Sequence, residues 1–123
     1  MMDKWQAQYK LWSSFGLPVY DASSVPDGDD RPDFPYITYQ GVDGMFDTDI
    51  PANVSIWTRG YSWLPANELS NTVYQALKDG GVIIPYDDGV IWVTAETPFS
   101  QNLGDPNDDL IRRKVLSVLL HFA

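Results

Sequence analysis

The sequence contains no cysteine and only one histidine, His121, in 123 residues. Without cysteine the chain has no disulfide bonds, thiolate metal ligands or cysteine nucleophiles, and this composition fits a reducing compartment. A Ser-His-acid arrangement would have to use His121, and no G-x-S-x-G motif accompanies it. No Walker motif or G-x-G-x-x-G motif occurs either. We therefore interpret His121 as a strand residue, and we expect no catalytic residue.

Long apolar runs are also missing. No apolar stretch approaches the roughly 18 residues that a membrane span needs, so no membrane partner is expected. Residues 1–5 lack a basic region followed by an apolar one, so no signal peptide is expected. These features favour a protein that is made and used in a cytoplasm, or built into a particle there.

Basic residues are few. Eight Lys and Arg stand against 17 Asp and Glu, giving a net charge of -9. Affinity for a phosphate backbone comes from Lys and Arg that displace counterions, so this chain should not bind nucleic acid tightly. The acidity either keeps the protein soluble or lets nucleic acid pass without sticking.

The many acids raise the question of a calcium site. Asp105, Asn107 and Asp109 have the first, third and fifth positions of an EF-hand loop. However, Leu110 stands where the loop requires Gly, and Leu116 stands where it requires Glu. We therefore expect no metal and no cofactor, although a loose, weak cation site stays open. No particular pair of carboxylates is selected for glycoside chemistry.

What the sequence does have is enough apolar residues, 44%, for the core of one domain spanning 1–123. Helical spacing of Trp5, Tyr9, Trp12 and Phe15 predicts a helix over 3–15. The other expected elements, in chain order, are an extended connection (18–35), a strand (36–42), a loop (43–51), a strand (52–63), a helix (65–79), a hairpin (82–85 and 90–93), a polar loop (97–109) and a last strand (110–122). This order predicts an α+β fold: a mostly antiparallel four- to five-stranded sheet packed by two helices.

Charges of both signs lie close together in the run 104–113. In a regular strand Arg112 and Arg113 point to opposite faces, so one can pair with an acid of the preceding turn while the other faces outward. Arginine suits bidentate carboxylate contacts across interfaces, and Asp108 and Asp109 can meet an arginine of a neighbouring subunit. The alternative is ordinary surface charge.

Aromatic and basic residues also share one face of the strand 52–63. Trp57 and Arg59 lie on that face and Tyr61 follows them. Trp, Tyr and Arg are the residue types enriched at interface hot spots. We predict these three residues as interface residues together with Asp108, Asp109, Arg112 and Arg113, with burial of Trp57 beneath a helix as the alternative.

Several segments together, over almost the whole chain, give a resemblance to a known family. They are LWSSFGLPVY (11–20), FPYITY (34–39), SIWTR (55–59), IPYDDG (84–89), IWV (91–93), TPFSQ (97–101) and DPNDDLIRR (105–113). In order and spacing these segments resemble the tail terminator, or minor tail-completion, proteins of the necks of long-tailed phages and prophages.

The resemblance implies a small α+β virion protein that forms a hexameric ring. The ring caps the head-proximal end of the tail tube, ends tube polymerisation and offers a docking face to the neck connector proteins. The implied partners are further copies of the chain, the tail tube protein and the connectors, with assembly in the host bacterial cytoplasm. The genome passes through the channel without specific binding, so reversing channel acids to lysine should slow its delivery.

Two alternatives stay open. One is another neck component, a head-completion or head–tail joining protein. The other comes from a different class, a small enzyme or metal-binding module. Thermal melting with calcium and with EDTA discriminates the metal-binding module, because a ligand bound only to the native state stabilises it.

Overall fold

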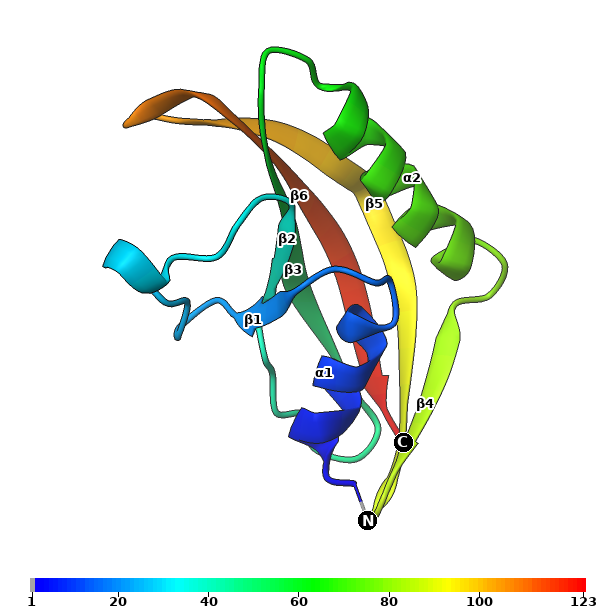
Figure 1. The fold of residues 1–123 in the computed structure, drawn as a ribbon. Helices are drawn as coiled ribbons and strands as arrows, with labels where there is room; N and C mark the ends of the chain where they lie inside the picture. Colours follow the sequence, from blue (N-terminus) through cyan, green and yellow to red (C-terminus); the bar gives the residue numbers. More distant parts are fainter. Residues whose placement is uncertain (1) are drawn as a thin grey trace.

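Residues 2–123, which the computed structural model describes, fold into two helices and a six-stranded sheet (Figure 1). The elements in chain order are α1 (Lys4–Ser13), β1 (Val19–Asp21), the short 3-10 turn η1 (Gly28–Asp30), β2 (Tyr36–Tyr39), β3 (Thr48–Arg59), α2 (Leu64–Leu77), β4 (Val82–Tyr86), β5 (Gly89–Asp105) and β6 (Asp108–Phe122). The predicted α+β class with two packing helices is confirmed.

The sheet is larger than predicted and it is mixed. Its strand order is β1-β2-β3-β6-β5-β4, and every neighbouring pair is antiparallel except β1 and β2. The sixth strand lies inside 18–35, which was predicted as an extended connection. Val19 to Asp21 pairs with Ile37 to Tyr39 in parallel, and so short a strand gives no periodic signal in the sequence.

The predicted polar loop 97–109 is wrong. β5 continues to Asp105 and β6 begins at Asp108, so only a two-residue turn separates two long strands. The register of β5 against β6 shifts between Ala95 and Ser100, which breaks the alternation of apolar and polar residues there. Beyond this bulge most β5 residues are exposed, and main-chain pairing with β6, not burial, holds the polar residues of β5 in strand conformation.

The predicted loop 43–51 and strand 52–63 also need correction. β3 begins at Thr48, because it pairs with β6 as far as Phe122. It ends at Arg59, and Gly60 follows with a φ of 154°. Tyr61 therefore lies beyond the strand, with 87% of its surface exposed.

Helix α1 starts with a capping box. The Asp3 carboxylate accepts a hydrogen bond from the backbone N–H of Gln6 at 2.8 Å, and the backbone N–H of Asp3 donates to the Gln6 side chain at 3.0 Å. Trp12 is buried, whereas Trp5 and Tyr9 of the predicted aromatic stripe are half-exposed. The buried stripe of α1 is Ala7, Gln8, Leu11 and Trp12.

Helix α2 begins with a proline in its first turn, where the missing N–H costs no hydrogen bond. It ends before Gly80 and Gly81, which both have positive φ. The positive φ already favours glycine at position 81. A Cβ atom there would also lie 2.2 Å from the carbonyl oxygen of Val93, which is a second reason why this position requires glycine. Neither helix in residues 2–123 has the length and apolar character needed to cross a bilayer.

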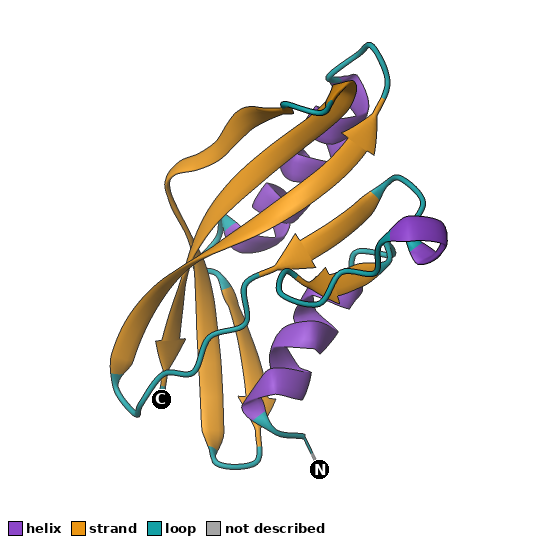
Figure 2. Cartoon of the chain, turned by 90° about the vertical axis from the view of Figure 1, so that its left-hand side faces the viewer, coloured by secondary structure: helices purple, strands orange, loops and turns teal. Residues whose placement is uncertain are grey.

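Both helices contribute to one core on one face of the sheet. Alternate residues of β3 and β6 point into it, and the buried residues of the two helices cover them. Helix α1 contacts β1 and β4, the two edges of the sheet, so it bridges the opening left by the curled and twisted strands (Figures 1 and 2). In the described part of the chain no helix packs on the opposite face, which we call the outer face.

Two prolines lie where strands have no neighbour. Pro51 lies in the half of β3 beyond Val54, where pairing with β2 has ended. Pro85 lies in β4, at the edge of the sheet. Because proline has no N–H, it removes a donor that another strand would use. These prolines protect the open edges against unwanted pairing.

Candidate interaction surface

The seven predicted interface residues gather at one end of the sheet, where β3 ends and β6 begins. In the register of these two strands Trp57 lies opposite Arg113 and Arg59 lies opposite Ile111. Asp108 and Asp109 start β6, and Tyr61 lies just beyond β3. Pairing of distant segments thus brings together residues that are up to 56 positions apart in the sequence, from Trp57 to Arg113.

One row of side chains crosses four strands on the outer face. Tyr36 pairs with Trp57, Trp57 with Arg113, and Arg113 with Leu103. We call these four residues the aromatic–arginine platform. Sequence reasoning found Trp57 and Arg113 but missed Tyr36 and Leu103, because only the strand register places them beside the others.

The platform is held by specific contacts. The rings of Tyr36 and Trp57 stack with centroids 5.9 Å apart and an interplanar angle of 10°. The Arg113 guanidinium carbon lies 4.5 Å from the centre of the Trp57 ring, and Arg113 Nε donates to the Ser55 hydroxyl at 3.0 Å. Trp57 Nε1 donates to the Thr38 hydroxyl at 2.8 Å. Trp57 therefore lies on the face away from both helices, in a fixed orientation.

Further aromatic rings support Tyr36. The centroid of the Phe34 ring lies 5.4 Å from that of Tyr36, and Tyr20 meets Tyr36 edge-on at 6.1 Å. Burial raises the pKa of the Tyr36 hydroxyl, and the positive charges of Arg31 and Arg113 oppose this rise. The phenol thus stays uncharged beside the arginine, and the platform carries the charge of Arg113.

Arg112 and Arg113 do point to opposite faces. Arg112 lies on the helix side, with its guanidinium carbon 5.6 Å from the centre of the Trp63 ring. Its terminal nitrogens donate to the backbone carbonyls of Tyr61, at 3.4 Å, and of Asp109. Its Nε is buried and has no hydrogen-bond partner among the described residues. The hydrogen bonds of the Arg112 guanidinium therefore go to neutral backbone carbonyls.

Neither arginine forms the expected ion pair with the preceding turn. In residues 2–123 no carboxylate oxygen lies within 4.0 Å of Arg112 or Arg113. Burial lowers the pKa of Arg113, and Asp105, acting from beyond that distance, opposes the shift. Asp108, which follows the turn, pairs instead with Arg59: the distance from Arg59 Nε to Asp108 Oδ2 is 2.9 Å.

The two aspartates at the start of β6 differ in their environments. Asp108 also accepts a hydrogen bond from the backbone N–H of Leu110 at 2.9 Å, and its pKa is lowered by the hydrogen bonds from Arg59 and Leu110. Asp109 is exposed, and its carboxylate has no hydrogen bond or ion pair within the described residues. Only Asp109 of this pair is free to meet another molecule.

Acids dominate the other end of the sheet. His121 lies beside Asp49 and Asp47, with its Nε2 3.7 Å from Asp47 Oδ1, and Lys4 pairs with Asp43. The β4–β5 turn, Asp87-Asp88, lies at this same end. The Asp87 carboxylate accepts from the N–H of Met2 at 2.9 Å, and the N–H of Asp87 donates to the Met2 carbonyl at 2.8 Å.

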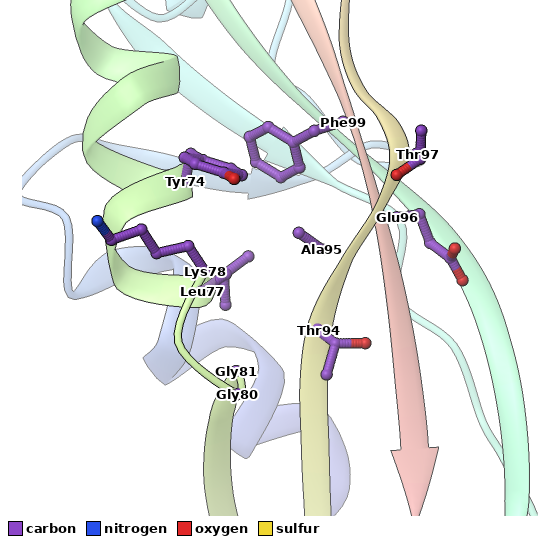
Figure 3. Close-up of a pocket in the computed structure, with 10 residues that line it drawn as sticks. All are labelled: Tyr74, Leu77, Lys78, Gly80, Gly81, Thr94, Ala95, Glu96, Thr97 and Phe99. Carbon is purple, nitrogen blue, oxygen red and sulfur yellow. The ribbon is translucent and has the colours of Figure 1, made fainter.

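A hollow also lies between α2 and the bulge of β5 (Figure 3). The rings of Tyr74 and Phe99 lie against each other at one end of it, with centroids 5.3 Å apart. The side chains of Lys78 and Glu96 point away from each other, on opposite sides of the hollow. This arrangement does not bring an acid and a base together on one bound group.

No metal centre accompanies this surface in the described residues. Within 2–123 no group of three or more His, Asp or Glu side chains is placed to hold a metal ion. The sequence matches no model of a known protein family. It also has no match among the curated proteins.

Proposed function

We propose that this protein is a structural component of a virion, a tail terminator that caps the head-proximal end of a phage tail tube as a hexameric ring. The observation that carries the proposal is the aromatic–arginine platform. It presents a Trp and an Arg on a sheet face that no described helix covers, and hydrogen bonds hold both side chains in place. Fixed Trp, Tyr and Arg side chains are typical anchors of protein interfaces.

The long β5–β6 hairpin supports an assembly role. Its tip, between β5 and β6, lies away from both helices (Figure 1). Beyond the bulge the hairpin has little core to cover, since most of its β5 side chains are exposed. An arm of this kind leaves side chains free for contact with a neighbouring molecule, as in a ring whose subunits use two different patches.

The net charge supports passage of DNA through such a ring. With a charge of -9, the chain has few groups that displace counterions from a phosphate backbone. One base at the arm is already neutralised within the fold, because Arg59 pairs with Asp108. A ring of these subunits would let DNA slide.

Light-scattering mass tests the proposal, measured for the protein alone and with purified tail tube protein. A six-subunit species, or a monomer that becomes part of capped tubes of fixed length, would support the terminator. A protein that ignores tubes but binds heads or connectors would favour the other neck role, a head-completion or head–tail joining protein. A monomer that binds none of these would overturn the proposal.

A further inference from the structure

We propose that copies of this chain associate head to tail, with the Asp88 turn of one copy docking on the aromatic–arginine platform of the next. The inference rests on the proposed ring and names the two patches that would form its subunit contact. It follows from the position of unpaired charge, from exposed apolar side chains and from the rigidity of both patches.

The platform carries a positive charge that has no ion-pair partner in its own chain, although Asp105 acts on it from beyond ion-pair distance. The chain has about two acids for every base, yet neither Arg112 nor Arg113 has a carboxylate within ion-pair distance in residues 2–123. Arg113 remains part-exposed beside Trp57 on the outer face. A carboxylate from outside would meet a guanidinium that is already positioned, and it would gain a bidentate contact.

Most of the acids near strand ends are already engaged. Asp43 pairs with Lys4, Asp49 with His121, and Asp108 with Arg59. Asp3 caps α1. Asp88 and Asp109 are exposed, and their carboxylates make no hydrogen bond or ion pair in the described part of the chain. Asp109 lies at the same end of the sheet as the platform, whereas Asp88 lies at the tip of a tight turn at the other end.

The acidic loop 27–33 is a poorer candidate. It lines a hollow together with Arg59 and Asp108, so it lies at the same end of the molecule as the platform. A contact between two different patches requires a donor that lies away from the platform. The Asp88 turn meets this requirement, because β5 joins the turn to the hairpin tip over 17 residues, a path of roughly 50 Å.

Apolar side chains accompany both patches. Ile83 and Trp92 form a cross-strand pair next to the turn, with 65% and 42% of their surfaces exposed. Leu103 of the platform is 45% exposed. Trp92 pairs with His121, and Leu103 pairs with Arg113. His121 and Arg113 lie on the same face of β6, the outer face. Ile83, Trp92 and Leu103 therefore all lie on the outer face. Burial of these residues would add a hydrophobic contribution to the charge contact.

Both patches are rigid before contact. The turn is fixed by the two hydrogen bonds between Asp87 and Met2, and by two between Val90 and Ala123 at 2.7 and 2.9 Å. The platform is fixed by Ser55 and Thr38. Patches that are ordered in advance lose little conformational entropy on association.

A charge exchange tests the contact. Arg113→Glu gives a copy with two acidic patches, and Asp88→Arg gives a copy with two basic patches. Each variant alone should lose the ring-sized mass, because every contact would join like charges. A one-to-one mixture should regain it, because alternating copies join opposite charges at every contact. Matched controls are Lys78→Glu and Asp79→Arg, which make the same charge changes on exposed residues after α2 and should leave the mass unchanged.

Cross-linking gives a second measurement in which Asp88 and Arg113 are both unchanged. The chain has no cysteine, so Ile83→Cys and Leu103→Cys introduce single thiols at exposed positions and leave the Asp88 carboxylate in place. A mixture of the two variants should form a disulfide-linked dimer, and the double variant should form a ladder that ends at the ring. Asp79→Cys with Leu103→Cys is the control pair and should stay uncross-linked.

The outcomes separate this inference from the proposed function. If wild type forms rings, single charge variants that keep the ring mass, or a mixture of the Ile83→Cys and Leu103→Cys variants that forms no disulfide-linked dimer, would overturn the docking contact alone. Head-to-tail association without any effect on tail tubes would support the contact and overturn the terminator role. Wild type that stays monomeric with and without tubes would overturn both.

Discussion

Arg59 Nε lies 2.9 Å from the carboxylate of Asp108, and this pair joins the end of β3 to the start of β6. Both side chains are part-exposed, so the pair contributes little to stability at neutral pH. It also fixes the β5–β6 hairpin close to its turn, and it leaves Asp105, Asp109, Arg112 and Arg113 nearby without an ion-pair partner in residues 2–123.

The Asp108 pair predicts a pH-dependent difference in stability. The fold lowers the pKa of Asp108, so the stabilisation is complete above the ordinary aspartate pKa of about 3.9 and is lost as the pH falls through the folded value. Asp108→Asn keeps an acceptor for Leu110 and removes the charge. We expect the variant to melt slightly below wild type at about pH 6, and we expect this difference to shrink as the pH falls below the ordinary aspartate pKa of about 3.9.

Thermal melting across this pH range checks the prediction. Asp79→Asn is the control, since Asp79 is exposed and has no ion pair in the described residues. A melting difference for Asp108→Asn that persists unchanged into acid would contradict a charge-based contribution.

Trp57→Phe is expected to reduce the free energy of unfolding by about 1 kcal/mol. The ring would still stack on Tyr36, but the hydrogen bond from Nε1 to the Thr38 hydroxyl would be lost. Urea denaturation measures the change. Trp5→Phe is the control and should change stability by less than about 0.5 kcal/mol, because Trp5 is half-exposed. Equal effects of the two substitutions would contradict the role given to the indole N–H.

Gly80→Ala and Gly81→Ala are expected to differ strongly. Both residues have φ above 80°, which costs an alanine about 1 kcal/mol. A Cβ on Gly80 meets nothing within 4 Å, whereas one on Gly81 would lie 2.2 Å from the Val93 carbonyl oxygen. Gly81→Ala should therefore cost about 3 kcal/mol. Chemical denaturation of both variants checks the difference, and equal losses would argue against the close approach to β5.

Pro85→Thr should increase association through the edge of β4. In the register of the β4–β5 hairpin, Ile84 and Tyr86 direct their main-chain groups toward β5, so residue 85 directs its own outward. Threonine would add an exposed N–H to an edge that lacks one there. We expect faster growth of light scattering in concentrated solution, with an unchanged or slightly higher melting temperature. Pro26→Thr, in a loop, is the control, and equal growth for both variants would contradict edge pairing.

The helices and the β4–β5 hairpin were predictable because their signals are local. The spacing of Trp5, Tyr9 and Trp12 and the Asp-Gly turn each act within a few residues. β1 and the outer half of β5 were not predictable, because non-local pairing determines them: β1 has three residues, and the outer half of β5 covers no core. Propensity gives no information about such strands.

The residue types of the candidate surface could be predicted from the sequence, whereas the contacts between those residues could not. Trp57, Arg59 and Arg113 are interface types in strand-like surroundings, and β3 and β6 do bring them together. The stacking of Arg113 on Trp57 and the pairing of Arg59 with Asp108 depend on the strand register. Tyr36 and Leu103 join the platform only through that register, so their own sequence contexts gave no signal.

The position of β6 has a consequence for biosynthesis. β6 is the last strand in the chain and lies in the middle of the sheet, between β3 and β5. While the ribosome is translating residues 1–107, β3 has only the short β2 beside it and β5 has only β4. The two halves of the sheet cannot join until β6 has left the exit tunnel, so a nascent chain exposes the apolar faces of both halves until then. Chaperone binding during translation is therefore expected to last until the final strand emerges.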